Sequence, residues 1–130
     1  MNIYLDIEGV LLRGKEIAPH LEEFLKYITD NHTVYWLTTH CKGDSKYTID
    51  YLKRYLDNNL IKYLEKIKET NWNINKIEAI DFSKEFRWLD DYVSLTEQEI
   101  LKERGVYNNW LKIDLNVNIN ILKDIINKLK

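Results

Sequence analysis

The chain has 130 residues, of which 45% are hydrophobic and 31% charged, with one Pro and four Gly. This length and balance are typical of a globular protein and exclude a disordered or fibrous chain, so we expect residues 1–130 to form one domain. The 19 basic and 21 acidic residues leave a net charge of −2, which supplies no overall positive field for nucleic acid or an anionic membrane. Neither is expected as a partner.

The cellular compartment is indicated by cysteine content and hydrophobicity. Cys41 is the single cysteine, so it can form neither an intramolecular disulfide nor a cysteine zinc cluster. No stretch reaches the roughly 18 to 20 apolar residues of a membrane-spanning helix, and Asp6 and Glu8 interrupt any signal-peptide core. We therefore expect a cytoplasmic protein.

The first half of the chain alternates between strand and helix patterns. Asn2–Leu5 is a short apolar run that predicts a buried strand with Asp6 at its carboxyl end. Residues 20–29 follow Pro19 with apolar side chains at helical spacing, which predicts a helix. Residues 33–37 are β-branched and aromatic and predict a second strand, which ends at the polar pair Thr38-Thr39.

The second half continues this alternation. Residues 45–68 predict two helices, and residues 73–79 a short helix that carries Lys76. Residues 86–89 predict a third strand that stops at Asp90-Asp91. Thr96 is expected to cap a helix through residue 102, with Glu99 as its capping-box partner. A strand over residues 110–115 and a helix over residues 119–129 complete the series.

This order of elements predicts an α/β fold. Parallel strands need crossover connections, so the sheet should be parallel and covered by helices on both faces, as a three-layer α/β sandwich. Ligands of such sheets bind beyond the carboxyl ends of the strands. Asp6, Thr38 and Asp90-Asp91 are all predicted to lie there.

Four short motifs appear in a characteristic order. They are Asp6-Ile7-Glu8-Gly9-Val10-Leu11, the strand ending at Thr38, Lys76, and Trp88-Leu89-Asp90-Asp91. Over residues 1–95 this order resembles the haloacid-dehalogenase-like (HAD) hydrolase superfamily, which implies a Rossmann-type sheet. Neither gap between motifs is long enough for the cap domain that many of these enzymes carry, so the resemblance implies a capless type with an open crevice.

The resemblance also implies a role for each motif residue. Asp6 would be the nucleophile that becomes an aspartyl phosphate, and the substrate would be a phosphomonoester of unknown size. Asp6, the backbone carbonyl of Glu8, Asp90 and Asp91 would hold Mg²⁺. The substrate-binding residues would be Thr38, which donates a hydrogen bond to the phosphate, Lys76, which neutralises its charge, and Gly9 and Thr39 beside them.

Glu8 departs from the family pattern. Phosphatases of this superfamily usually have Asp there, as general acid and base. The extra methylene of Glu moves the carboxyl by roughly the length of a C–C bond, and positioning errors of about 1 Å can cost on the order of 10²-fold in rate. The leading hypothesis is a Mg²⁺-dependent phosphohydrolase. The alternative is a weakly active or inactive binding or regulatory protein that keeps the phosphate and Mg²⁺ pocket.

Three further alternatives concern single positions or the whole site. Lys84 competes with Lys76 as the motif lysine, because it lies closer to Asp90. His40 and Cys41 are expected at the rim of the crevice rather than in a metal or Cys-His site. A phosphotransfer receiver domain uses similar residue types. Receivers, however, place their acidic pair at the first strand and the phosphorylated Asp at a later strand, and this chain order differs from the one found here.

Overall fold

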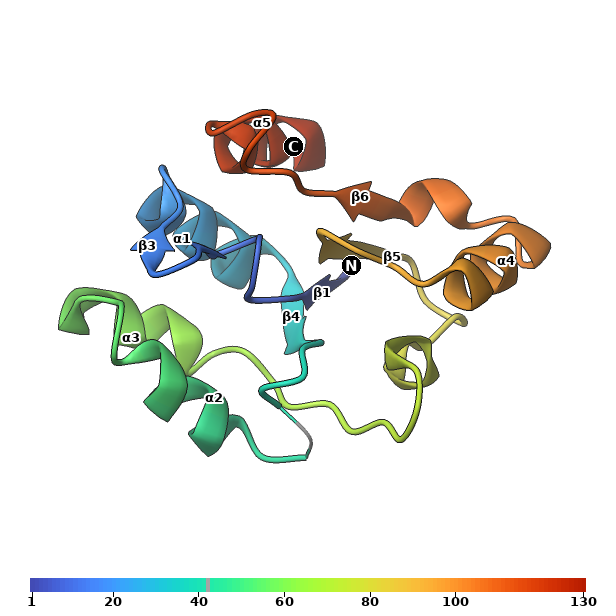
Figure 1. The fold of residues 1–130 in the computed structure, drawn as a ribbon, viewed down its shortest axis with the longest axis horizontal. Coiled ribbons are helices and arrows are strands. Elements are labelled where there is room, and N and C mark those ends of the chain that lie inside the picture. Colours follow the sequence, from blue (N-terminus) through green and yellow to red (C-terminus); the bar gives the residue numbers. More distant parts are fainter. Residues whose placement is uncertain (42) are drawn as a thin grey trace.

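The computed structural model describes residues 1–41 and 43–130 as a mixed α/β fold built around a four-stranded parallel sheet (Figure 1). The strand order is β4-β1-β5-β6, where the strands span Thr33–Trp36, Asn2–Leu5, Phe86–Asp90 and Trp110–Lys112. Leu5 pairs with Trp36 on one side and with Leu89 on the other. The first strand is therefore central, and its carboxyl end lies between those of β4 and β5.

Helices connect the strands. The described residues contain α1 (Leu21–Asn31), α2 (Ser45–Leu52), α3 (Asn58–Leu64), α4 (Leu95–Glu103) and α5 (Ile121–Leu129), with 3₁₀ turns η1 (Lys76–Ala79) and η2 (Tyr107–Asn109). In residues 1–41 and 43–130, no helix is long and apolar enough to cross a membrane.

Two apolar clusters pack against the two sides of the sheet. Ile3 and Leu5 of β1 belong to a cluster with residues of α1, α3 and α5, whereas Tyr4 between them belongs to a second cluster with residues of η1 and α4. Successive side chains of a strand point to opposite faces, so the clusters lie on opposite faces. In Figure 1, α4 accordingly lies across the strands from α1.

The predicted elements differ from the observed ones mainly at their ends. The capping box of α4 consists of Ser94 and Glu97, so the expected Thr96-Glu99 box is wrong. Thr96 lies inside the helix because Ser94 already supplies the side-chain acceptor for the first turn. The last strand is also shorter than expected and ends at Lys112.

A two-stranded hairpin after β1 was not expected. Strands β2 (Leu12–Arg13) and β3 (Glu16–Ile17) pair antiparallel, and Gly14 in the turn between them has a φ of 63°. Two-residue strands are too short to produce an alternating pattern, which is why the sequence predicted no strand here. The hairpin lies beside the carboxyl ends of the parallel strands.

Candidate functional site

Three carboxylates meet where β1 and β5 end. Asp6 directly follows β1 and Asp90 is the last residue of β5, and the two residues are 6% and 1% exposed. The backbone N–H of Asp6 donates to the carbonyl of Leu89 at 3.0 Å, which holds the two strand ends together. One carboxylate oxygen each from Asp6, Asp90 and the exposed Asp91 lie within 4.8 Å of one another.

Lys76 lies between the two buried carboxylates. Its Nζ is 2.8 Å from Oδ2 of Asp90 and 3.4 Å from Oδ2 of Asp6, and the side chain is 17% exposed. Burial opposes the charged amine, but the two carboxylates outweigh burial and raise the pKa of Lys76. Lys84, by contrast, is exposed in the connection before β5. The structure therefore brings Lys76, rather than Lys84, to the carboxylates.

Two further carboxylates position the turn that carries Lys76. Oε2 of the buried Glu97 accepts from the backbone N–H of Ile77 at 3.0 Å, while its Oε1 accepts from the hydroxyl of Ser94 at 2.9 Å. At the other side of the turn, Glu78 accepts from three successive backbone N–H groups, those of Asn73, Ile74 and Asn75. Glu97 was not among the residues predicted from the sequence, although the Ser94-x-x-Glu97 spacing is itself a capping-box signal.

The electrostatics of Asp90 indicate a place for a cation. Burial and the neighbouring Asp6 together raise the pKa of Asp90 to about 8, while Lys76 opposes the shift. Carboxylate oxygens are the ligands that Mg²⁺ prefers, and one or two carboxylates together with water or substrate oxygens usually hold this ion. The donor set of Asp6, Asp90 and Asp91 therefore fits a magnesium ion.

Thr38 and Thr39 follow β4 and differ in exposure. Thr38 is 1% exposed, and its hydroxyl oxygen accepts from the backbone N–H of His40 at 3.3 Å. Among the described residues the Thr38 hydroxyl donates to no acceptor, so its proton is available for a hydrogen bond to another group. Thr39 is exposed. Cys41, expected at the rim, is instead fully buried in the apolar core.

Glu8 is held by two side chains from elsewhere in the fold. Its Oε1 accepts from the hydroxyl of Tyr51 on α2 and lies 3.3 Å from Nε2 of His40. The rings of His40 and Tyr51 stack with centroids 4.0 Å apart. The hydrogen bond to Glu8 strongly raises the pKa of Tyr51. No sequence signal pointed to Tyr51, because only the packing of α2 brings it to Glu8.

Gly9 is in contact with Asp91. Gly9 has a φ of 77°, and a Cβ added there would lie 2.5 Å from Oδ2 of Asp91. Both the backbone conformation and the space therefore require glycine, and any side chain must displace the Asp91 carboxylate.

Gly9→Ala is expected to weaken Mg²⁺ binding about tenfold, because moving a ligand carboxylate by about 1 Å disturbs near-octahedral coordination. The measurement is isothermal titration with Mg²⁺. Gly105→Ala is the matched control, since Gly105 has a φ of 71° but no atom within 4 Å of an added Cβ. It shares the left-handed backbone strain, about 1 to 2 kcal/mol. Equal affinity in the two variants would contradict the prediction.

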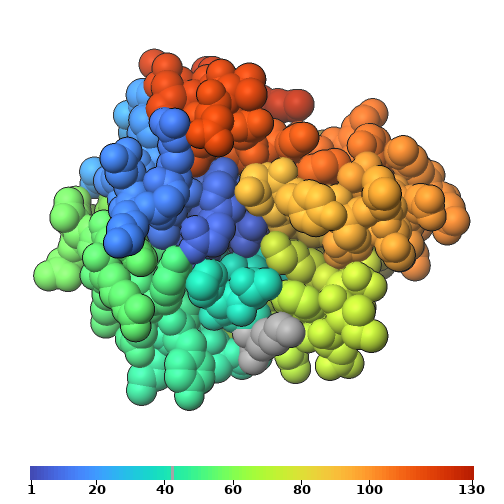
Figure 2. Space-filling view, in the orientation of Figure 1, coloured from blue at the N-terminus to red at the C-terminus, as the bar shows by residue number. Residues whose placement is uncertain are grey.

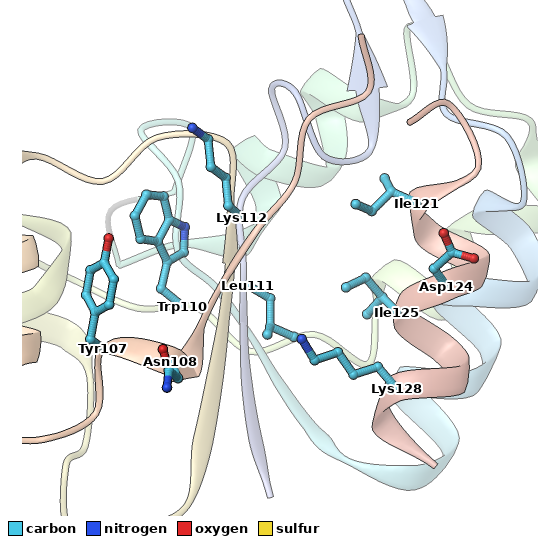
Figure 3. Close-up of a pocket in the computed structure, with 9 residues that line it drawn as sticks. All are labelled: Tyr107, Asn108, Trp110, Leu111, Lys112, Ile121, Asp124, Ile125 and Lys128. Carbon is cyan, nitrogen blue, oxygen red and sulfur yellow. The ribbon is translucent and has the colours of Figure 1, made fainter. Parts of the chain in front are cut away.

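A cavity that is separate from this site lies elsewhere in the fold. It has a volume of about 500 Å³ and lies between β6, η2 and α5 (Figure 3). Figure 3 shows the apolar side chains of Leu111, Ile121 and Ile125 beside this space, with Asp124 and Lys128 on α5. None of the three clustered carboxylates lines it. The side chains that could perform chemistry therefore lie at the carboxyl ends of β1 and β5, and not in this cavity.

Comparisons of the chain with protein-family models, with curated proteins and with solved structures find no match. The interpretation of this site accordingly depends on its own residues and their geometry.

Proposed function

We propose that the protein is a Mg²⁺-dependent phosphohydrolase that cleaves phosphomonoesters through Asp6, with a capless HAD-like fold. The observation that carries the proposal is the position of the Lys76 amine, 3.4 Å from Asp6 and 2.8 Å from Asp90, at the ends of adjacent parallel strands. A lysine beside a nucleophilic carboxylate and a group of metal-ligating carboxylates is the arrangement that phosphoryl transfer through an aspartyl phosphate requires.

The proposed fold is a three-layer α/β sandwich. Its support is the parallel sheet with separate apolar clusters on its two faces. The backbone N–H of Trp36 also donates to the carbonyl of Lys68 at 2.8 Å, so another segment runs parallel to β4 at the edge of the sheet. The order of the chain at the site is Asp6, Thr38, Lys76 and Asp90, which is the order of the HAD motifs.

In the proposed reaction, a carboxylate oxygen of Asp6 attacks phosphorus while the bond from phosphorus to the leaving oxygen breaks. Glu8 donates a proton to that oxygen and then accepts one from the water that hydrolyses the aspartyl phosphate. The Lys76 amine and the Thr38 hydroxyl stabilise the negative charge of the transferring group. Mg²⁺ held by Asp6, the Glu8 carbonyl, Asp90 and Asp91 would lower the repulsion between the nucleophile and the phosphate.

The test is phosphate release from a panel of phosphomonoesters, measured with Mg²⁺ and with EDTA, for the wild type and Asp6→Asn. We expect turnover only in the wild type with Mg²⁺, and a loss of at least about 10³-fold in Asp6→Asn, because the amide is not a nucleophile. An Asp6→Asn variant that keeps full turnover would disprove the proposal. Purifying both proteins in parallel excludes a contaminating phosphatase as the source.

A second candidate function is binding or regulation without catalysis, with the phosphate and Mg²⁺ pocket retained. The contacts of Glu8 favour it, because a carboxylate bonded to Tyr51 and near His40 is less free to transfer protons to a substrate.

Glu8→Asp distinguishes the two functions. The shorter side chain cannot keep the Tyr51 contact at the same backbone position, and it restores the residue of the family pattern. An increase in the rate constant of roughly tenfold or more would show that Glu8 limits the wild-type reaction, and would favour the second function. A decrease would show that the carboxyl of Glu8, as it is held here, is the working proton donor.

A further inference from the structure

A cavity of about 340 Å³ adjoins the three carboxylates. Gly9 and Asp91 line the side next to the carboxylate cluster, and Arg13 of the β2–β3 hairpin lines another. Lys112 and the segment that follows β6, up to Asn116, complete it. Figure 2 shows the blue surface of the N-terminal segment directly beside the orange surface of the segment after β6. The volume is at the lower end of the range for small-molecule sites, about 300 to 1,000 Å³.

Two cationic side chains of this cavity lack a carboxylate partner. All ion pairs within 4.0 Å among the described residues involve other side chains. Neither Arg13 nor Lys112 therefore has an acidic partner at that distance among these residues. Nε of Arg13 donates to Oδ1 of Asn116 at 2.9 Å, which orients the guanidinium and leaves its terminal N–H groups for a ligand. The cavity therefore offers two positive charges next to a metal-ligating group.

Asp114, the remaining acidic residue of the cavity, makes no ion pair with either cation among the described residues. Oδ1 of Asp114 accepts from the backbone N–H groups of Asn116, at 3.0 Å, and Val117, at 3.3 Å, which closes the turn after β6. Asp91 faces the carboxylate cluster, where a bound cation would take up its charge. An anion is therefore the ligand that the free groups of this cavity recognise best, because a planar guanidinium and an ammonium both bind phosphate and carboxylate strongly.

We infer that this cavity binds a second anionic group of the substrate, so that the preferred substrates are phosphomonoesters with a further phosphate or carboxylate a few bonds from the scissile phosphate. The inference rests on the proposed function. The two sites share Asp91 and Gly9, so one small molecule can reach from the phosphate at Asp6 to Arg13 and Lys112.

The experiment compares three phosphomonoesters that differ only at the far end. They are butyl phosphate, butane-1,4-diyl bisphosphate and 4-phosphooxybutanoate, and the readout is kcat/KM for phosphate release in the presence of Mg²⁺. We expect the wild type to prefer the two doubly anionic substrates by roughly tenfold, which is modest because both cations are exposed and screened by solvent. The phosphate and carboxylate substrates then show which anion is preferred.

Arg13→Gln and Lys112→Gln are each expected to lower that preference by about 3- to 10-fold. Lys15→Gln is the matched control, because Lys15 is an exposed cation of the same hairpin that does not line the cavity. It should leave the preference unchanged. A wild type without the preference, or the same preference in all three variants, would overturn the inference.

A binding measurement separates this inference from the proposed function. If the wild type hydrolyses none of the three esters, the shift in melting temperature with butane-1,4-bisphosphonate is compared with that for butylphosphonate, both with Mg²⁺. A larger shift with the bisphosphonate that is reduced in Arg13→Gln and Lys112→Gln supports the cavity while the phosphatase proposal fails. Equal shifts for the two phosphonates overturn the inference as well.

Discussion

Lys76→Met is expected to lower phosphate release by at least about 100-fold and to destabilise the metal-free protein. The rate should fall because the variant lacks the positive charge beside the transferring phosphate. The stability should fall because Asp6 and Asp90 then face each other without their shared cation. Breaking a buried ion pair costs about 3 to 5 kcal/mol, and protonation of Asp90 reduces that cost, so we expect roughly 2 to 3 kcal/mol. Thermal denaturation in EDTA, alongside a phosphate-release assay, measures both effects.

Lys84→Met is the matched control for this variant. Lys84 is exposed, and it lies in the connection before β5 rather than at the carboxylates. Its replacement should change neither the rate nor the melting temperature beyond experimental error, since isolated surface charges contribute little. If Lys84→Met lost activity and Lys76→Met kept it, the positions of these two amines would not reflect their roles, and the proposed site would be wrong.

Asp90→Asn is expected to stabilise the metal-free protein at high pH and to abolish its response to Mg²⁺. The pKa of Asp90 is raised from 3.8 to about 8, so the folded protein holds this proton more tightly than the unfolded chain does. The tighter proton binding stabilises the folded state fully at about pH 4. This stabilisation is lost progressively as the pH rises from about 4 through about 8. An amide at position 90 cannot ionise, so the variant should avoid this loss.

The measurement is the melting temperature of both proteins in EDTA between pH 4 and pH 9. The two proteins should melt at similar temperatures at pH 4, and the variant at least roughly 5 °C higher at pH 9, where the wild-type carboxyl is ionised. Adding Mg²⁺ at pH 9 should then raise the melting temperature of the wild type only, because the ion binds the folded carboxylates. A variant that melts lower than the wild type at pH 9 would contradict the shift at Asp90.

The parallel strands could be predicted from the sequence because most of their residues are apolar, β-branched or aromatic. β1 is buried along its whole length, whereas Thr33 of β4 is exposed and Arg87 of β5 is half-buried. The polar residues that end each run, Asp6, Thr38 and Asp90, marked the edge of the sheet where the site lies. The helix patterns were equally clear, although α4 begins two residues earlier than expected because Ser94, and not Thr96, is its cap.

The sequence did not predict the hairpin β2–β3 or the contacts that depend on it. Its strands have two residues each, which is below the length at which periodicity can be recognised. No pattern in the sequence paired Arg13 with Lys112, and the cavity that they share arises only because β6 and the hairpin meet beside Asp91. Residues about 100 positions apart in the chain form this cavity.

For the candidate site, the sequence by itself determined which residue types end the strands, because the local pattern of apolar and polar residues specifies where a buried strand stops. The tertiary structure decided which side chains meet there. It placed Lys76 rather than Lys84 between Asp6 and Asp90, and it brought Tyr51 to Glu8. These contacts join segments separated by 14 to 70 residues, and depend on how η1 and α2 pack against the sheet. No short-range pattern in a sequence encodes such packing.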